Sequence, residues 1–279
     1  MAFAGSAQVA NRSGASFEDV ELTLVAGEPN QTAKLQPRME RMAMAMAAPQ
    51  ADMASAPEAR ASGEYHAYTL PGRTSLPDGS VQQVPLLDPA RDIACERRYE
   101  TRNGVAGWTP PHPIAQRDFN LSEGRIRVEA SLRFVNDAGA GLGRPLPAGR
   151  VRMFDGADFL GEAMLRHTAV GDRAALPIGS VFDLNGERRR EHFELDRAGR
   201  TMTERFAVTL RNAKAAPATV RVVEGLPRWS EWEIVDGGGH TWTREDAHSA
   251  VAEVVVPANG GTTVAYTVRY RWAADVQPQ

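Results

Sequence analysis

Hydrophobic and polar residues alternate one by one along several long segments of this chain. In GRIRVEASLRFVN (residues 124–136), every second residue from Ile126 to Phe134 is apolar, and the residues between them are arginine, glutamate or serine. Two further segments, ERFAVTLRN (204–212) and TTVAYTVRYRW (262–272), repeat this alternation. Because successive side chains of a β-strand point to opposite faces, each segment predicts a strand with one buried face and one solvent face.

Turn residues separate these and shorter alternating segments at regular spacing. Gly, Pro, Asn and Asp gather in PDGS, FDGAD, LNGE, DGGG and PANGG, where tight turns need a positive or preset φ. Helical periodicity is nearly absent from the chain. The pattern therefore predicts an all-β protein built of two antiparallel β-sandwich-like domains.

The expected domains divide the chain once. Residues 1–177 form the less regular β-rich domain. Residues 178–273 form an immunoglobulin-like β-sandwich, because FAVTLRNAKAAPATVRVVEGLP is typical of two strands joined by a short turn and a long strand follows. Residues 274–279 are expected to be a frayed tail.

A Met/Ala/Pro-rich segment, RMERMAMAMAAPQADMASAPEAR (38–60), lies between two expected strands and contains five of the nine methionines. Charged residues interrupt it, so its apolar run is too short for a membrane helix. A short helix over residues 37–48 would be marginal alone. We therefore expect a long disordered loop over about residues 30–62.

Copper binding is an alternative for the same segment. The thioethers of Met42, Met44 and Met46 are soft ligands of the kind that Cu(I) prefers. No histidine or cysteine lies between residues 31 and 60 to complete such a site. The mobile loop is the favoured interpretation, and the copper loop stays open beside it.

Composition and charge exclude several classes of function. The net charge is −3 and basic residues are interleaved with acidic ones, so nucleic-acid binding is not expected. The only cysteine, Cys95, excludes an internal disulfide and a Cys-x-x-Cys zinc site, and its segment predicts a small buried side chain in a strand. No apolar run is long enough for a membrane span, and MAFAGSAQVANRSG lacks the pattern of a signal peptide.

Four segments, in order, carry a family resemblance: FAGSAQVANRSGASFEDVELTLVAGEPNQ, GEYHAYTLPGRTSLPDGSVQQVPLLD, RPLPAGRVRMFDGADFLGEAMLRHT and TERFAVTLRNAKAAPATVRVVEGLPRWSEWEI. Together they resemble the C-terminal domain-of-unknown-function family of mucoidy-inhibitor-like (MuiA-like) bacterial proteins, over essentially the whole chain. The resemblance implies a β-rich fold, no established activity or catalytic residues, and a periplasmic or cell-envelope location. Members usually carry a signal peptide and a further N-terminal region before the segment that starts this chain, so the resemblance implies a truncated member, a fragment or a misassigned start. A cytoplasmic location is expected if Met1 is the true start.

Histidine and acidic residues offer candidate chemistry. None of the six histidines has the i, i+4 spacing of a helical zinc motif. His240 and His248 flank TWTREDA, which contains Asp246. One interpretation is a site with a metal-binding or acid–base role. The other is two exposed loop histidines. The charged segment NGERRREHFELDR (185–197) predicts a solvated strand face rather than paired catalytic carboxylates. No hydrolase, phosphate-binding or dinucleotide motif is present, so we expect no catalytic residue, cofactor or metal.

Tryptophans form the most distinctive candidate surface. Trp229, Trp232 and Trp242 are close in sequence, and Glu231 and Glu233 lie among them. Flat indole faces beside carboxylates suit a sugar, because C–H groups stack on the ring and acids accept hydroxyl protons. The alternative is that tryptophans at i and i+3 fill a gap between sheets.

These observations predict a non-enzymatic binding or structural module of the cell envelope. Its partner is unknown, with a polysaccharide or an envelope protein as the candidates. The alternative is a carbohydrate-binding or carbohydrate-active protein that uses the region of Trp229, Trp232 and Trp242.

Overall fold

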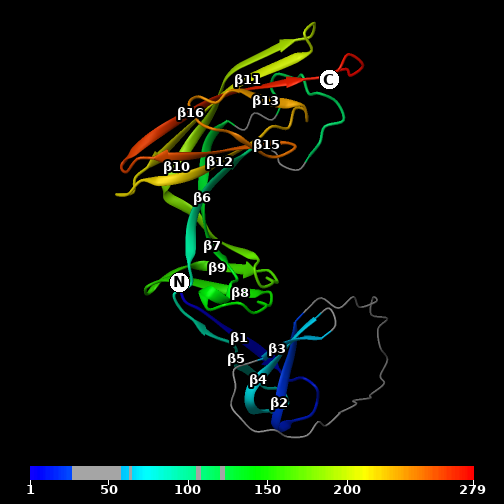
Figure 1. The fold of residues 1–279 in the computed structure, drawn as a ribbon, viewed down its shortest axis with the longest axis vertical. Helices are drawn as coiled ribbons and strands as arrows, with labels where there is room; N and C mark the ends of the chain where they lie inside the picture. The colour runs from blue at the N-terminus through cyan, green and yellow to red at the C-terminus, as the bar shows by residue number, and fades with distance from the viewer. Residues whose placement is uncertain (27–57, 63–64, 105–107, 120–122) are drawn as a thin grey trace. The chain divides into compact units, whose positions relative to one another are not determined.

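The computed structural model describes residues 1–26, 58–62, 65–104, 108–119 and 123–279 (Figure 1). Most of the expected loop over residues 30–62, including Met42, Met44 and Met46, lies outside the described residues. Glu58–Ser62 form strand β3, so the expected loop extended too far at that end. The pairing of β3 with β4 is a tertiary contact that local composition does not reveal.

Strands are the dominant structure of the described residues and helix is nearly absent, which confirms the all-β prediction. Among them the one helical element is a short 3-10 turn at Ala138–Ala140. No described helix has the length and apolar character needed to cross a membrane. The strands are β1 Phe3–Ala10, β2 Phe17–Ala26, β3 Glu58–Ser62, β4 Tyr65–Leu76, β5 Val81–Ala90, β6 Cys95–Asn103, β7 Gly124–Val135, β8 Gly149–Asp155, β9 Asp158–Leu165, β10 Arg173–Asp196, β11 Thr201–Asn212, β12 Ala218–Gly225, β13 Trp232–Asp236, β14 Thr243–Asp246, β15 Ser249–Val256 and β16 Gly260–Arg271.

The chain forms two compact units, and each unit is assembled from three segments. Unit 1 consists of Met1–Cys95, Phe134–Val151 and Met164–Ala175. Unit 2 consists of Glu96–Arg133, Arg152–Ala163 and Leu176–Gln279. A single division after residue 177 assumed continuous domains, whereas the long strands β7 and β10 each contribute residues to both units.

Unit 1 contains two small sheets. Strand β1 pairs antiparallel with β5, and β4 lies between β2 and β3 in a three-stranded sheet. Buried Asn136 organises the adjacent loops, because its Nδ2 donates hydrogen bonds to the carbonyls of Arg144, Thr168 and Ala169. The hydroxyl of buried Tyr68 donates to the carbonyl of Pro145 at 2.8 Å. Side-chain hydrogen bonds to backbone thus hold the loops of this unit.

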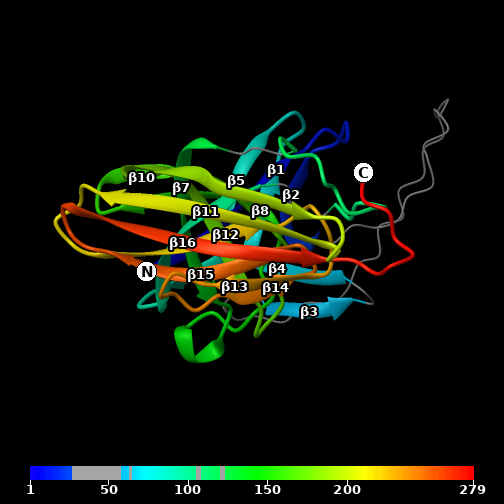
Figure 2. The same cartoon turned by 90° about the horizontal axis from the view of Figure 1, so that it is seen from above.

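Unit 2 is organised by a nine-stranded sheet among the described residues, in the order β13-β16-β11-β10-β7-β6-β12-β15-β14. Strands β11 and β16 run side by side in antiparallel register along their whole length (Figure 2). Strands β6 and β12 are an exception to the antiparallel expectation, because they pair in parallel. Whether residues 178–273 are immunoglobulin-like stays a prediction, since β6 and β7 come from earlier in the chain.

The sheet of unit 2 folds over so that its two halves share one core. Side chains of β11 and β16 meet side chains of β12 and β15 in a single buried cluster. The alternation seen in the sequence predicts these positions correctly. Every second residue of β16 from Val264 to Tyr270 is buried, as is Trp272 immediately after it.

The last residues of the chain are docked rather than frayed. The Gln279 backbone N–H donates to the Pro113 carbonyl at 2.9 Å, and its carbonyl accepts from the Ala115 N–H at 2.6 Å. Val276 packs against the core of unit 2. The prediction of a frayed tail over residues 274–279 is therefore wrong, because backbone pairing with a distant loop holds residues that have little structure of their own.

Candidate functional site

The three candidate tryptophans lie around the strands that follow β12. Trp229 is in the connection between β12 and β13, Trp232 begins β13, and Trp242 immediately precedes β14. Trp232 is part of the hydrophobic core, and Trp229 and Trp242 pack against it. The fold thus places all three at one core, with the indoles turned largely inward.

Trp232 is held on one face and at its polar edge. Its Nε1 donates to the carbonyl of Ala247 at 2.7 Å. The Arg244 guanidinium lies 4.0 Å from the ring centroid and also donates to the Trp232 carbonyl. This ring is nearly buried and one of its faces is covered, which matches the gap-filling interpretation for this residue.

The other two indoles also make protein contacts. The Trp242 ring centroid lies 4.6 Å from that of buried Tyr266, and its Nε1 donates to Gly237 at 3.3 Å. Trp229 is half-buried, and its Nε1 is buried without a hydrogen-bond partner among the described residues. Sugar binding at these rings stays a prediction.

The two candidate carboxylates differ in their surroundings. Glu233 Oε1 lies 3.1 Å from Arg269 Nε and 3.0 Å from Arg271 Nη2, so two arginines neutralise it. Glu231 is exposed, and its backbone carbonyl accepts a hydrogen bond from the Arg271 N–H. A ligand hydroxyl would therefore compete with two cations for Glu233.

The histidine candidates occupy separate environments. Buried His248 has its Nε2 at 2.8 Å from Thr109 Oγ1. Asp246 accepts a hydrogen bond from the His248 backbone N–H, which lowers the pKa of that carboxyl below its usual range. His240 contacts the Gly238 carbonyl instead.

Metal-binding side chains and the single cysteine are the remaining candidates for chemistry. No three His, Cys, Asp or Glu side chains of the described residues are grouped so that they could hold a metal ion. Cys95 begins β6 as expected, but it is exposed rather than buried, because the first three residues of the strand are all uncovered whichever face they occupy.

A buried ion pair is linked to Trp242 through Tyr266, which contacts both that indole and Glu224. Arg188 on β10 and Glu224 on β12 meet through Nε and Oε2 at 2.8 Å. Glu224 also accepts hydrogen bonds from Tyr266 Oη at 2.6 Å and from Asn103 Nδ2 at 2.7 Å. The Arg188 guanidinium stacks 3.8 Å from the centroid of the Phe206 ring. The carboxylate is thus fully surrounded by donors inside the core.

A second buried pair joins Arg228 to Glu204. Arg228 Nε lies 2.8 Å from Glu204 Oε2, and both side chains are almost completely buried. The remaining Arg228 nitrogens donate to backbone carbonyls of the loop before β7, at Ile114, Gln116, Arg117 and Phe119. One guanidinium therefore neutralises a core carboxylate and fastens a loop, a use for which its fixed fork of donors is suited.

These charges perturb the groups around them. Burial raises the pKa of the Tyr266 and Tyr270 phenols well above 10, and the nearby charges of Glu224 and Glu204, respectively, raise it further. Burial by itself would lower the pKa of Arg188, but Tyr266 and Glu224 raise it above its ordinary value. The two phenols and the Arg188 guanidinium therefore keep their protons at physiological pH.

The sequence contains a signal for these buried charges in the alternation of the strands that carry them. Glu204 precedes Phe206 by two residues and Glu224 follows Val222 by two, so both occupy inward positions of strands that alternate. The run from 185 to 197 was expected to be a solvated face, but Arg188 is buried there. An isolated charge at an inward position indicates a buried pair whose partner only the tertiary structure reveals.

An aromatic hairpin forms a second candidate surface. Phe154 on β8 and Phe159 on β9 flank the turn at Gly156, and their ring centroids are 5.4 Å apart. The side chains are 59% and 57% exposed. Two ion pairs border them, Arg152 with Glu162 at 2.8 Å and Arg97 with Asp155 at 3.3 Å.

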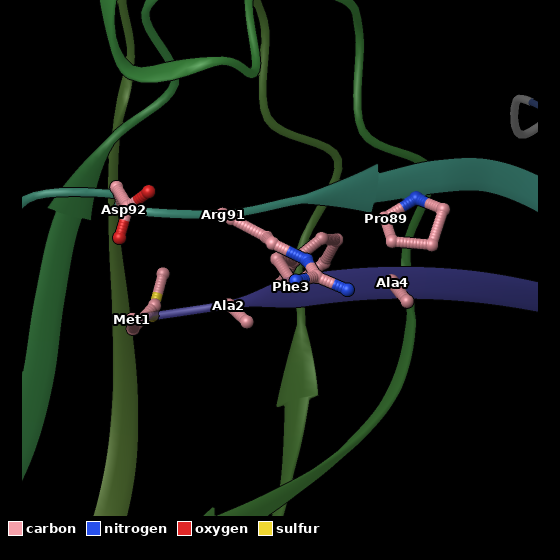
Figure 3. A pocket seen from close by; sticks show the side chains of 7 residues that line it. All are labelled: Met1, Ala2, Phe3, Ala4, Pro89, Arg91 and Asp92. Atoms are coloured by element: carbon pink, nitrogen blue, oxygen red, sulfur yellow. The ribbon is translucent and has the colours of Figure 1, made fainter.

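Unit 1 has an open hollow of about 560 Å³ where β1 begins. Residues at the start of β1 and around the end of β5 line it, including Phe3, Pro89 and Arg91 (Figure 3). Its lining includes the charged side chains of Arg91 and Asp92, but it is open to solvent rather than enclosed, so it does not define a ligand.

Comparison with known proteins identifies a family. The sequence model of the family described as Domain of unknown function (DUF4139) matches residues 1–274. No curated protein and no solved structure matches the chain. The match spans nearly all of the residues, both compact units included. The chain therefore belongs to the DUF4139 family, a domain family of unknown function.

Proposed function

We propose that the chain is a non-enzymatic binding module of the bacterial cell envelope, and that the aromatic hairpin β8–β9 contacts a protein partner. The observation that carries this proposal is the exposure of Phe154 and Phe159 side by side. Large aromatic side chains contribute much of the binding energy when an interface covers them.

The surroundings of the two rings support an interface. A cross-strand aromatic contact can also serve simply to stabilise a hairpin. Here the Arg152–Glu162 ion pair already joins the two strands, so the rings are not needed for that role alone. An apolar centre bordered by charged pairs is the usual composition of a protein-binding surface. The envelope location is supported by the resemblance to MuiA-like bacterial proteins.

Photo-crosslinking in the bacterium tests the proposed surface. A photoreactive phenylalanine analogue at position 159 should crosslink to a discrete partner, whereas the same analogue at exposed Val255 on β15 should not. The double variant Phe154→Ser/Phe159→Ser should lose that partner with little change in Tm, because both side chains are already in water. Equal crosslinking at both positions, or an unchanged partner in the double variant, would contradict the proposal.

The alternative is a carbohydrate-binding or carbohydrate-active protein that uses the tryptophan region. It is supported by the buried Trp229 Nε1, a donor without a partner among the described residues. Titration of intrinsic tryptophan fluorescence with acidic and neutral oligosaccharides would detect binding at Trp229, Trp232 or Trp242. Product analysis on the same sugars separates binding from turnover, and released products would contradict a non-enzymatic module.

A further inference from the structure

Strand β1 differs from every other described strand in its charge. Its sequence, FAGSAQVA, contains no Asp, Glu, Lys or Arg, whereas each of the other described strands contains at least one. Strand β1 pairs with β5 on one side, and no other described strand pairs with it. It is therefore an uncharged edge strand in unit 1.

Sheet edges are normally protected from pairing with other chains. Charged side chains, proline and short length are the usual devices. The two edges of the nine-stranded sheet follow this rule: β13 has Glu233 and Asp236, and β14 is four residues long with three charges. Strand β1 has eight residues, no proline and no charge, and its register with β5 is irregular only around Gly5, so that residues 6–10 form a regular, unprotected edge.

The turn at the end of β1 shows which backbone N–H and C=O groups of this strand point toward β5 and which point away. The Asn11 N–H donates to the Ser80 carbonyl, and the Asn11 carbonyl accepts from the Gly79 N–H. Backbone groups of an antiparallel strand alternate between its two sides, so Val9 and Ala7 face β5 while Gln8 and Ser6 face away. The register agrees, because Ser6 lies opposite Pro85, which has no N–H to donate.

We propose that β1 pairs with β1 of a second copy of this chain, antiparallel and centred on Gln8. The outward N–H and C=O groups require an extended strand as their partner, which is why another strand rather than a small molecule fits this edge. In this register Gln8 lies opposite Gln8 of the second copy, Ser6 opposite Ala10, and Ala7 opposite Val9. The pair would join two β1–β5 sheets into one four-stranded sheet.

Charge supports a second copy as the occupant. A two-fold axis places identical residues opposite each other, so any charge at the centre of a strand would face a like charge. Strand β1 meets this condition along its whole length, and the opposed Gln8 amides can donate and accept hydrogen bonds with each other. The proposal concerns unit 1 and does not depend on the aromatic hairpin.

Sedimentation of the full chain over a range of concentrations tests the proposal. The chain should form a dimer of twice its 30.3 kDa mass. Gln8→Glu places two carboxylates directly opposite and should weaken the dimer at least about tenfold at pH 7. Gln83→Glu is the matched control: Gln83 lies beside Gln8 on β5, so its carboxylates would be about 14 Å apart at three strand spacings and should leave the dimer unchanged.

A disulfide trap provides the second readout. In a Cys95→Ser background, Gln8→Cys should form a disulfide-linked dimer on mild oxidation, because the Cα atoms of a hydrogen-bonded antiparallel pair are about 5.5 Å apart, a separation that a disulfide spans. Gln83→Cys in the same background should not. A monomer at all concentrations, or a dimer that survives Gln8→Glu without the Gln8→Cys disulfide, would overturn the proposal. The proposal would also be overturned if the dimer were lost only in Phe154→Ser/Phe159→Ser, or if Gln8→Cys formed its disulfide with a different protein.

Discussion

Arg188 Nε donates a hydrogen bond to Glu224 Oε2 at 2.8 Å, where the two side chains are only 3% and 0% exposed. Arg188 belongs to β10 and Glu224 to β12, strands that are separated by β7 and β6 in the order of the sheet. The pair therefore joins the two halves of the folded sheet through the core. Since a buried ion cannot recover its hydration, this contact strongly favours one way of closing the sheet.

Breaking this pair should be costly, and removing both charges should cost less than the two single changes together. Glu224→Leu leaves the Arg188 charge buried without its carboxylate and should lower the free energy of unfolding by about 3–5 kcal/mol. Arg188→Met leaves the Glu224 charge buried without its guanidinium and should lower the free energy of unfolding by a similar amount. A double-mutant cycle by urea unfolding measures the coupling, and additive losses would show that the two side chains do not interact.

Arg228 should be required for the loop before β7. Arg228→Met removes the partner of buried Glu204 and all donors to the loop carbonyls, so it should lower the free energy of unfolding by about 3–5 kcal/mol. Arg228→Lys keeps the charge but lacks the forked donors, so hydrogen exchange in residues 113–119 should increase while the core strands stay protected. Exposed Arg189→Lys is the control and should change neither measurement.

Alkaline pH should destabilise the fold through the buried tyrosines. Burial raises the pKa of Tyr270 in the folded state, so its contribution to stability is complete below the unfolded pKa of about 10 and is lost as pH rises toward the folded pKa. The urea concentration at the midpoint of unfolding should therefore decrease as the pH is raised from about 9 to about 11. Tyr270→Phe keeps the ring but has no proton to lose, so its decline should be shallower by up to about 1.4 kcal/mol per pH unit. An equal slope in both proteins would contradict the assignment.

Core positions identified by alternation should be sensitive to truncation. Phe134→Ala in unit 1 and Val268→Ala in unit 2 each empty a buried site and should cost about 2–5 kcal/mol, measured by chemical unfolding. Val255→Ala, on the outward face of β15, should change the free energy of unfolding by less than about 0.5 kcal/mol. A similar loss at all three positions would mean that the alternation does not report burial.

The candidate site was predictable in part. The sequence predicts a common location for Trp229, Trp232 and Trp242, and the fold does place them at one core. It did not reveal that Arg244 covers Trp232 or that two arginines hold Glu233, because those partners come from other strands. The aromatic hairpin was also missed, since exposure of Phe154 depends on what the rest of the chain leaves uncovered.

Local alternation by itself determined that this chain forms strands and which residues of β7, β11 and β16 face the core, because the period of two follows from the geometry of a single strand. Only the tertiary structure decided which strands are neighbours, that β6 and β12 run parallel, and that residues 274–279 are docked. It also decided which carboxylate each buried arginine meets. Those outcomes depend on contacts between residues that are tens to more than a hundred positions apart, and the energy of such a contact is absent from any local window of sequence.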